Sequence, residues 1–299
     1  MNSISIFFII LYLIFLVIGK IKYVKRVEKI VDIVVILLIL SISYWAGEEI
    51  ASNQIFGLLI NSLILGTLSI IITYFSGVAI RHFSNTKPLM KAKREKMIIS
   101  NSNKQTIIKY MLPFVIGWIL GLLFHISNTI IVSLVDYELY ALASVLGYIM
   151  GKDVSRKVIL RSSKDSLISL FITILGDIIL ALVMYMLHVT TFTISLAIAL
   201  ASGWYSYVGP LVAVNSDPYL GTLAFLVNFL REQLTYVLVP LLLKLKFEPR
   251  SAIAVGGATS MDTTLPLYVE VLGKDYALSA MISGVILTIV IPIILPLIV

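Results

Sequence analysis

The chain has 299 residues, of which 59% are hydrophobic and only 13% are charged, and it contains no cysteine. Soluble domains have roughly 45–50% apolar residues, so the composition predicts a polytopic helical membrane protein, and the lack of cysteine excludes disulfides, thiol chemistry and cysteine metal sites. The net charge of +7 comes from short basic clusters between apolar runs, a pattern that reports membrane orientation and does not indicate a nucleic-acid partner.

Five apolar runs in the first half of the chain predict five membrane-spanning helices. The first run is followed by a basic cluster that starts at Lys20, the third by the basic segment 81–109, and the fifth by a cluster that starts at Lys152. Basic loops face the cytoplasm, so we expect the N-terminus to lie outside. The runs are Ile4–Gly19, Ile30–Gly47, Ile55–Ile80, Tyr110–Phe124 and Ile130–Gly151.

The sixth predicted helix, Leu167–Leu187, carries Asp177 near its midpoint. A carboxylate at that depth is unfavourable by about 2.5–3.5 kcal/mol on insertion scales unless it is paired, hydrated or protonated. Asp177 is therefore a candidate functional residue. A structural role, as a protonated or interhelically bonded side chain, is an equally good interpretation.

Two later stretches interrupt apolar runs with glycines, hydroxyl residues and a proline. Residues 201–210 read ASGWYSYVGP, and residues 256–266 read GGATSMDTTLP. In a bilayer, broken backbone survives only where it is buried in protein or lines a polar cavity. The two stretches are therefore our first candidates for a binding site.

The basic residues that follow the first broken stretch predict its topology. If Ile194–Val214 crossed the membrane, the next helix, Tyr219–Leu243, would deliver basic residues to the outside, against the pattern of all earlier loops. A re-entrant hairpin removes this conflict. The same reasoning predicts a second hairpin at Ile253–Val271, entering from the cytoplasm, and a last crossing at Tyr276–Val299. The predicted fold class is all-α, with about eight transmembrane helices and two opposed broken hairpins, as in inverted-repeat transporters.

The seventh predicted helix, Tyr219–Leu243, has a polar stripe in its middle. Asn228, Glu232 and Tyr236 are spaced at i, i+4 and i+8 and share one face. An intramembrane acid is a functional-site hypothesis by default. Arg231 points about 100° away from its neighbour Glu232, and we expect it to be the counter-ion of an intramembrane acid. The acids that it could pair with are Glu232, Asp177 and Asp262.

The two broken stretches and the NFLREQLTYVLVP segment between them, in this order and spacing, resemble the lysine exporter (LysO) family of inner-membrane carriers. The similarity is clear from Ile130 to Val299, and upstream it is one of hydropathy and helix count. It implies export of L-lysine and its toxic analogues, both termini outside, and a functional pair of intramembrane acids, which by motif are Glu232 and Asp262. The family's first motif reads ASGFGWYS, so this chain lacks a Phe-Gly pair and has a shorter first hairpin.

The chain is expected to form a single integral membrane transporter domain. Its N-terminal part is residues 1–83, its basic cytoplasmic linker is residues 84–109, and its family-like part is residues 110–299. We expect it in the inner membrane as a multi-pass protein whose C-terminus, like its N-terminus, lies outside. No enzymatic activity, metal or cofactor is expected.

Lysine carries two ammonium groups and one carboxylate, so its site needs acids for the first and backbone N–H groups for the second. Glu232 and Asp262 suit the ammonium groups, and amides around Ser202–Gly203 and Gly256–Thr259 suit the carboxylate. Trp204 and Tyr205 could contact the alkyl chain or an ammonium, although packing in the core is as good an interpretation. The candidate site residues are Glu232, Asp262, Asn228, Ser260, Thr259, Thr263, Ser202, Gly203, Trp204 and Tyr205, with Thr264 among the nearby hydroxyls and Asp177, Arg231 and Tyr236 as accessory residues.

Exporting a cation against an inside-negative potential requires about 2.3 kcal/mol per charge per 100 mV. The sequence has no phosphate-binding G-x-x-x-x-G-K-[ST] motif, so inward movement of protons, or of sodium, is the expected energy source. Two other functions are weighed against lysine export. The nearer is a sodium or other cation/proton antiporter, and the more remote is an intramembrane enzyme, which the missing G-x-G-D motif of aspartyl proteases disfavours.

Overall fold

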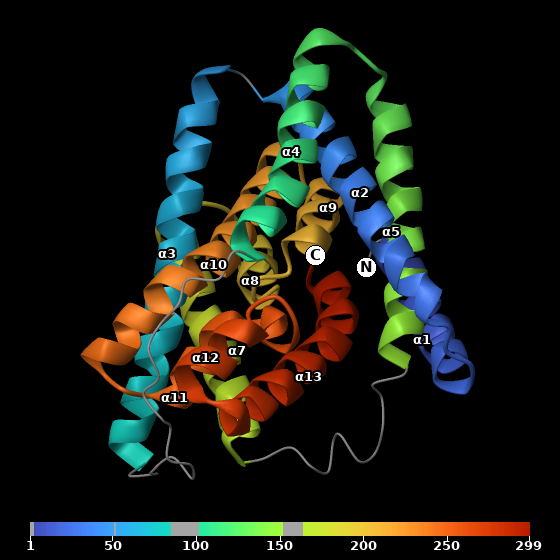
Figure 1. Ribbon diagram of the computed structural model, residues 1–299. Helices are drawn as coiled ribbons and strands as arrows, with labels where there is room; N and C mark the ends of the chain where they lie inside the picture. Colours follow the sequence, from blue (N-terminus) through green and yellow to red (C-terminus); the bar gives the residue numbers. More distant parts are fainter. Residues whose placement is uncertain (1–2, 51, 85–101, 152–163) are drawn as a thin grey trace.

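The computed structural model describes residues 3–50, 52–84, 102–151 and 164–299, and this part of the chain is helical throughout (Figure 1). Five helices are long and apolar enough to cross a membrane, and two shorter apolar helices, Phe7–Ile21 and Ile108–Leu123, accompany them. The protein is therefore an all-α, multi-pass membrane protein. The five long segments are Gln54–His82, Asn128–Ile149, Lys164–Met186, Pro218–Leu245 and Tyr276–Ile298.

The helices follow the apolar runs of the sequence closely. Short 3-10 turns precede the second helix (η1, Lys25–Val27) and follow the eleventh (η2, Gly257–Met261). The helices are α1 (Ser3–Ile21), α2 (Glu28–Glu49), α3 (Ser52–Ser84), α4 (Ser102–Leu123), α5 (Asn128–Gly151), α7 (Lys164–Met186), α8 (Phe192–Leu200), α9 (Tyr205–Asn215), α10 (Pro218–Leu245), α11 (Pro249–Gly256), α12 (Leu265–Leu272) and α13 (Lys274–Ile298).

Helices α1, α2, α4 and α5 form one packed layer, in which α1 lies along α5 and α2 lies along α4 (Figure 1). The pairs approach closely because glycines lie at the contacts. A Cβ atom on Gly121 would lie 2.0 Å from the Tyr44 carbonyl oxygen, and one on Gly147 would lie 2.3 Å from the Tyr12 carbonyl oxygen. Such small-residue contacts are the usual basis of helix association in membranes.

The second layer is built on α3, α7 and α10. Gly77 of α3 packs against Ile172 of α7, and Gly176 of α7 packs against Thr73 of α3. These two helices therefore run antiparallel. Helix α10 runs parallel to α3, because Gly66 packs beside Leu230 and the far ends of both helices also meet through a hydrogen bond from the Tyr74 hydroxyl to the Lys246 carbonyl. Helices α7 and α10 therefore point in opposite directions.

The first broken stretch reverses the chain inside this layer. Helix α8 folds back along α7, whereas α9 lies antiparallel to α10, with Gly209 beside Phe225 and Gly221 beside Ala213. Because α7 and α10 point in opposite directions, α8 and α9 do too. The reversal falls at residues 201–204, where Ser202 and Gly203 have φ angles of 51° and 93°. This is the hairpin geometry that the charge pattern predicts.

The second broken stretch reverses the chain from the opposite end. Helix α11 follows directly on α10 and rises beside α7, where the Thr173 hydroxyl donates to the Ala254 carbonyl at 3.1 Å. Helix α12 then returns beside α11: Tyr268 lies against Gly256 at the end of α11, and Tyr268 and Leu272 share a buried apolar cluster with Ile253 in its middle. The two reversals touch, since the Ala258 amide donates to the Ser202 carbonyl at 3.0 Å.

The larger apolar core joins the two layers around the first hairpin. Phe114 of α4 stacks on Phe225 of α10 with ring centroids 5.2 Å apart, and Tyr205 at the beginning of α9 meets Phe225 and Phe229 edge-on. The first layer is thus held against α9 and α10 by aromatic side chains. Glu232, the acid of the polar stripe, follows Phe229 by one turn of α10.

Candidate substrate cavity

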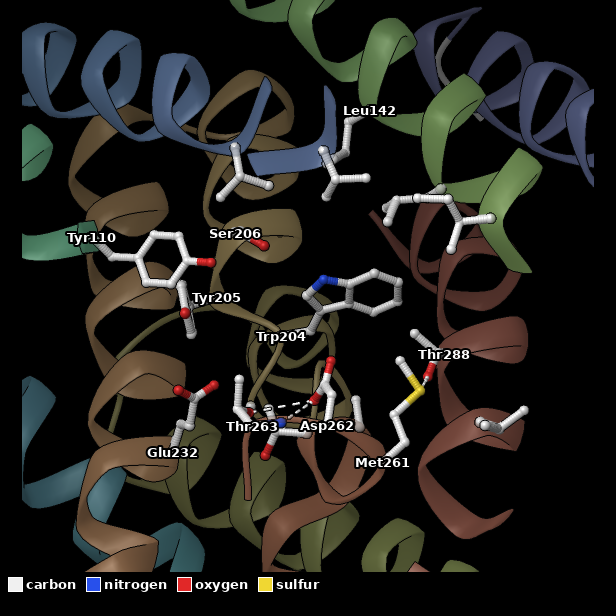
Figure 2. Close-up of a pocket in the computed structure, with 18 of the residues that line it drawn as sticks. Tyr110, Leu142, Trp204, Tyr205, Ser206, Glu232, Met261, Asp262, Thr263 and Thr288 are labelled. Carbon is white, nitrogen blue, oxygen red and sulfur yellow. Dashed lines mark hydrogen bonds between the residues drawn. The ribbon is translucent and has the colours of Figure 1, made fainter. Parts of the chain in front are cut away.

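A cavity of about 550 Å³ lies where the two layers meet the hairpin tips (Figure 2). One wall comes from α2 and α5 and is wholly apolar. The other wall comes from the first hairpin tip, α10, η2 and the turn after it, and α13, and it carries the polar groups. The lining residues are Val31, Val35, Tyr110, Leu142, Leu146, Ile149, Gly203, Trp204, Tyr205, Ser206, Glu232, Ala258, Thr259, Met261, Asp262, Thr263, Met281, Val285 and Thr288.

Glu232 and Asp262 face this same cavity, one from the middle of α10 and the other from the turn between η2 and α12 (Figure 2). Glu232 is only 3% exposed, and the exposed surface of Asp262 borders the cavity. Glu232 accepts a hydrogen bond from the neighbouring Gln233 amide at 3.0 Å, and Asp262 accepts one from the Thr263 backbone amide at 2.6 Å. Within the described parts of the chain neither carboxylate is in an ion pair.

Arg231 points away from the cavity and pairs with Asp177. Its Nη1 lies 2.6 Å from Asp177 Oδ1, and its Nε donates to the Val255 carbonyl at 3.1 Å. Asp177 also accepts a hydrogen bond from the Ser202 hydroxyl. Of the three acids that the sequence offers to Arg231, the structure selects Asp177. This buried pair joins α7, α10 and both hairpins, which favours the structural interpretation of Asp177.

The polar stripe of α10 holds one hairpin at each end. Asn228 Oδ1 accepts from the Gly203 amide at 2.8 Å, and its Nδ2 donates to the Ile198 carbonyl at 2.9 Å. One turn beyond Glu232, the Tyr236 hydroxyl donates to the Thr263 carbonyl. Asn228 and Tyr236 therefore fix the backbone of the hairpins, and Glu232 between them is left to face the cavity.

Seven of the ten residues first expected at the site line the cavity, and three do not. Asn228 is engaged as described above, Ser202 bonds Asp177, and the Ser260 hydroxyl donates to the carbonyls of Gly257 and Ala280 at 2.7 and 2.9 Å. These three are supports behind the lining. The seven that line it are Glu232, Asp262, Thr259, Thr263, Gly203, Trp204 and Tyr205.

Three of the amides expected to receive a carboxylate are already engaged within the protein. The Ser202 amide donates to Ala199, the Gly203 amide to Asn228, and the Ala258 amide to Ser202. These groups hold the hairpin tips together and are not open to a ligand. An anion site on these three amides would require them to give up these bonds, and one on the remaining amides around Gly256–Thr259 stays a prediction.

Sequence reasoning missed the apolar wall, because these residues look like ordinary lipid-facing or core side chains. Their helical spacing does carry a signal: Val31 and Val35 are four apart, and Leu142, Leu146 and Ile149 follow at i, i+4 and i+7. That spacing identifies a face of each helix. It does not identify what the face borders, which depends on long-range packing.

The family's sequence model, described as lysine exporter LysO, matches residues 111–299. This chain belongs to the lysine exporter LysO family. It is 39% identical over 98 residues to a protein of Escherichia coli named lysine exporter LysO, a match that covers 32% of each chain. It is 26% identical over 164 residues to a protein of Haemophilus influenzae whose name marks it as a candidate lysine exporter, covering 52% of this chain and 77% of that one. No solved structure matches this LysO-family chain.

The family match begins in the middle of α4 and includes both hairpins, the polar stripe and every acid that faces the cavity. Helices α1, α2 and α3 lie outside it. Of the cavity lining, Val31, Val35 and Tyr110 precede the matched residues. The polar half of the cavity is thus a feature of the LysO-family segment, and part of the apolar half is supplied by the region before it.

Proposed function

We propose that this protein is a secondary-active exporter that moves L-lysine and lysine analogues out of the cytoplasm in exchange for protons moving inward. The observation that carries the proposal is the pair of carboxylates, Glu232 and Asp262, that share one cavity without a basic partner in the described chain. The names of the two relatives, which refer to lysine export, support the choice of substrate.

The cavity suits an organic cation better than a bare metal ion. Its volume of about 550 Å³ falls in the range of small-molecule sites, which are mostly apolar with a few placed polar groups. The acids would hold the side-chain ammonium group of lysine, and the wall of Val35, Leu142 and Leu146 would contact its alkyl chain. Among the described residues no group of three or more His, Cys, Asp or Glu side chains could hold a metal ion. A sodium or other cation/proton antiporter remains the nearer alternative, because carbonyl and hydroxyl oxygens beside one carboxylate suffice to bind sodium.

Proton coupling follows from the shared position of the two acids. Burial in a medium of low dielectric constant favours the neutral form of a carboxylic acid, so an empty cavity favours protons on Glu232 and Asp262. Bound lysine replaces those protons with its side-chain ammonium group. Competition for the same carboxylates would link lysine export to proton import, and it would supply the roughly 2.3 kcal/mol per charge per 100 mV that export requires.

We further propose that the chain forms one transporter domain of the cell's inner membrane with eight full spans, an inverted repeat and both termini outside. The helix directions support this proposal, because α8–α9 and α11–α12 reverse from opposite ends of α7. Paired broken helices that meet near the middle of the bilayer are typical of carriers with inverted repeats. The basic clusters between the spans support the orientation.

Lysine efflux from loaded proteoliposomes under an imposed pH gradient tests the function. The wild type is compared with Glu232→Gln and Asp262→Asn, and with Asp217→Asn as a matched control that neutralises a carboxylate outside the cavity lining. We expect efflux to depend on the pH gradient in the wild type and the control, and to fall at least tenfold in the two acid variants. Undiminished efflux in both variants would refute the site, and efflux driven by sodium alone would refute proton coupling.

A further inference from the structure

The beginning of α9 borders the cavity, and its Ser206 lies on the side away from the acids. Gly203, Trp204, Tyr205 and Ser206 all contribute to the lining. In Figure 2 the Trp204 indole lies across the cavity, with the Ser206 hydroxyl on one side of it and Asp262 on the other. Ser206 therefore lies away from the acids, whereas Tyr205 of the same turn lies between Ser206 and Glu232 and interacts electrostatically with both acids.

Ser206 has polar groups that the protein leaves unused. The residue is only 8% exposed, and its hydroxyl is directed into the cavity (Figure 2). Within the described chain this hydroxyl has no hydrogen-bond partner, whereas the nearby hydroxyls of Ser202, Thr259 and Ser260 each donate to a protein oxygen. Buried polar groups are normally hydrogen-bonded, so an unpartnered hydroxyl that faces a cavity indicates a bound solute.

The Ser206 amide is the free N–H of the same turn. The amides of Trp204, Tyr205 and Tyr207 donate to Ala201, Gly203 and Trp204. No backbone acceptor for the Ser206 amide exists among the described residues, and Trp204 at the N-cap position makes no side-chain cap. The N-terminus of an 11-residue helix such as α9 carries partial positive charge and favours anions.

We propose that the first turn of α9, through the amide and hydroxyl of Ser206, is a carboxylate subsite that makes the cavity select amino acids over diamines of the same length. The inference rests on the proposed function and extends it. Glu232 and Asp262 recognise ammonium groups, which lysine and 1,5-diaminopentane both carry. Ser206 recognises the α-carboxylate, which only lysine carries.

The subsite takes the place of three amides expected from the sequence. The amides at 202, 203 and 258 hold the two hairpins together, so the anion must be received elsewhere. The Ser206 position also separates the charges of the ligand correctly, with the carboxylate at the electropositive helix end and the side-chain ammonium at the acids. An amino acid longer than lysine by several methylenes would not fit between Ser206 and the acids.

Competition binding on the full-length purified protein tests the proposal, with labelled lysine displaced by lysine, lysinamide or 1,5-diaminopentane. The wild type is expected to prefer lysine over both competitors by roughly tenfold or more, since a hydrogen bond to a charged group is worth about that factor. Ser206→Ala should weaken lysine by roughly tenfold and leave the diamine unchanged. Ser206→Asp should reverse the preference, because a carboxylate there repels lysine and attracts the second ammonium.

Ser195→Ala is the matched control. Ser195 is a fully buried serine of the same hairpin, and its hydroxyl also lacks a hydrogen-bond partner in the described chain. Unlike Ser206, it lies outside the cavity lining. It should bind all three ligands as the wild type does. Equal weakening of lysine and diamine by Ser206→Ala, or an unchanged preference in Ser206→Asp, would overturn the subsite. Lysinamide tests the subsite without any substitution in the protein. If the wild type bound lysinamide as tightly as it binds lysine, the subsite would also be overturned. A wild type that binds no lysine would overturn the proposed function, and this inference with it.

Discussion

The Asp177–Arg231 pair should behave as a unit, so that removing one member destabilises the protein more than removing both. Asp177 is fully buried and Arg231 is 1% exposed, with 2.6 Å between Oδ1 and Nη1. Asp177→Asn keeps the shape of the side chain and removes its charge. The guanidinium of Arg231 would then be a buried cation without a counter-ion.

The expected magnitude follows from this geometry. Breaking a buried ion pair by removing one partner typically destabilises a protein by about 3–5 kcal/mol, whereas replacing both partners with neutral groups is often close to neutral. Asp177→Asn and Arg231→Gln should therefore each lower the free energy of unfolding by about 3–5 kcal/mol. The double variant should lose less than either single variant, which corresponds to an interaction energy of about 3 kcal/mol or more.

Thermal unfolding of the purified protein in one detergent provides the measurement, with lysine binding as a second readout. Asp217→Asn is the matched control, because it makes the same chemical change at the N-cap of α10. Asp217 accepts a hydrogen bond from the Leu220 amide there, and asparagine is as good an N-cap as aspartate. The control should unfold as the wild type does. Additive effects of the two substitutions, or a stable and active Asp177→Asn protein, would refute the assignment of this pair as a structural joint.

Three further substitutions test the packing around the cavity. Asn228→Ala should lower lysine transport more than tenfold while the protein remains folded, because it frees the first hairpin tip behind the lining, and a folded variant with full transport would contradict this. Gly121→Leu should prevent stable folding, because a Cβ at this position would lie 2.0 Å from a carbonyl oxygen of α2. Gly57→Leu should be tolerated, because no atom lies within 4 Å of a Cβ built at Gly57. Thermal unfolding distinguishes the two variants. Leu142→Trp should fill the cavity and abolish lysine binding, whereas the same change at the exposed Leu134 should leave binding unchanged.

The sequence was sufficient to place both hairpins and the acids. The glycine- and serine-rich segments of 201–210 and 256–266 predict broken helices, and the structure breaks them at 201–204 and around Gly257. Gly209 and Pro210 do not break the chain, because α9 runs through both. The i, i+4, i+8 spacing in α10 correctly put Asn228, Glu232 and Tyr236 on one face. These are local properties of the chain, so they can be read without a fold.

The remaining features depend on contacts between distant segments. Nothing in the sequence distinguishes Asp177 from Glu232 as the partner of Arg231, because the choice is made by the packing of α7 against α10. The apolar wall of Val31 and Leu142 was not predicted for the same reason. The free groups of Ser206 could be recognised only after every other amide near the hairpin tips had been given its partner.

The central claim is that Glu232 and Asp262 hold either protons or lysine. Calorimetric titration of lysine into the purified protein, repeated in buffers of different ionisation enthalpy, counts the protons released for each lysine bound. The account predicts net proton release in the wild type, and reduced release with weaker binding in Glu232→Gln and Asp262→Asn. Tight lysine binding without proton release, unchanged in both variants, would contradict it.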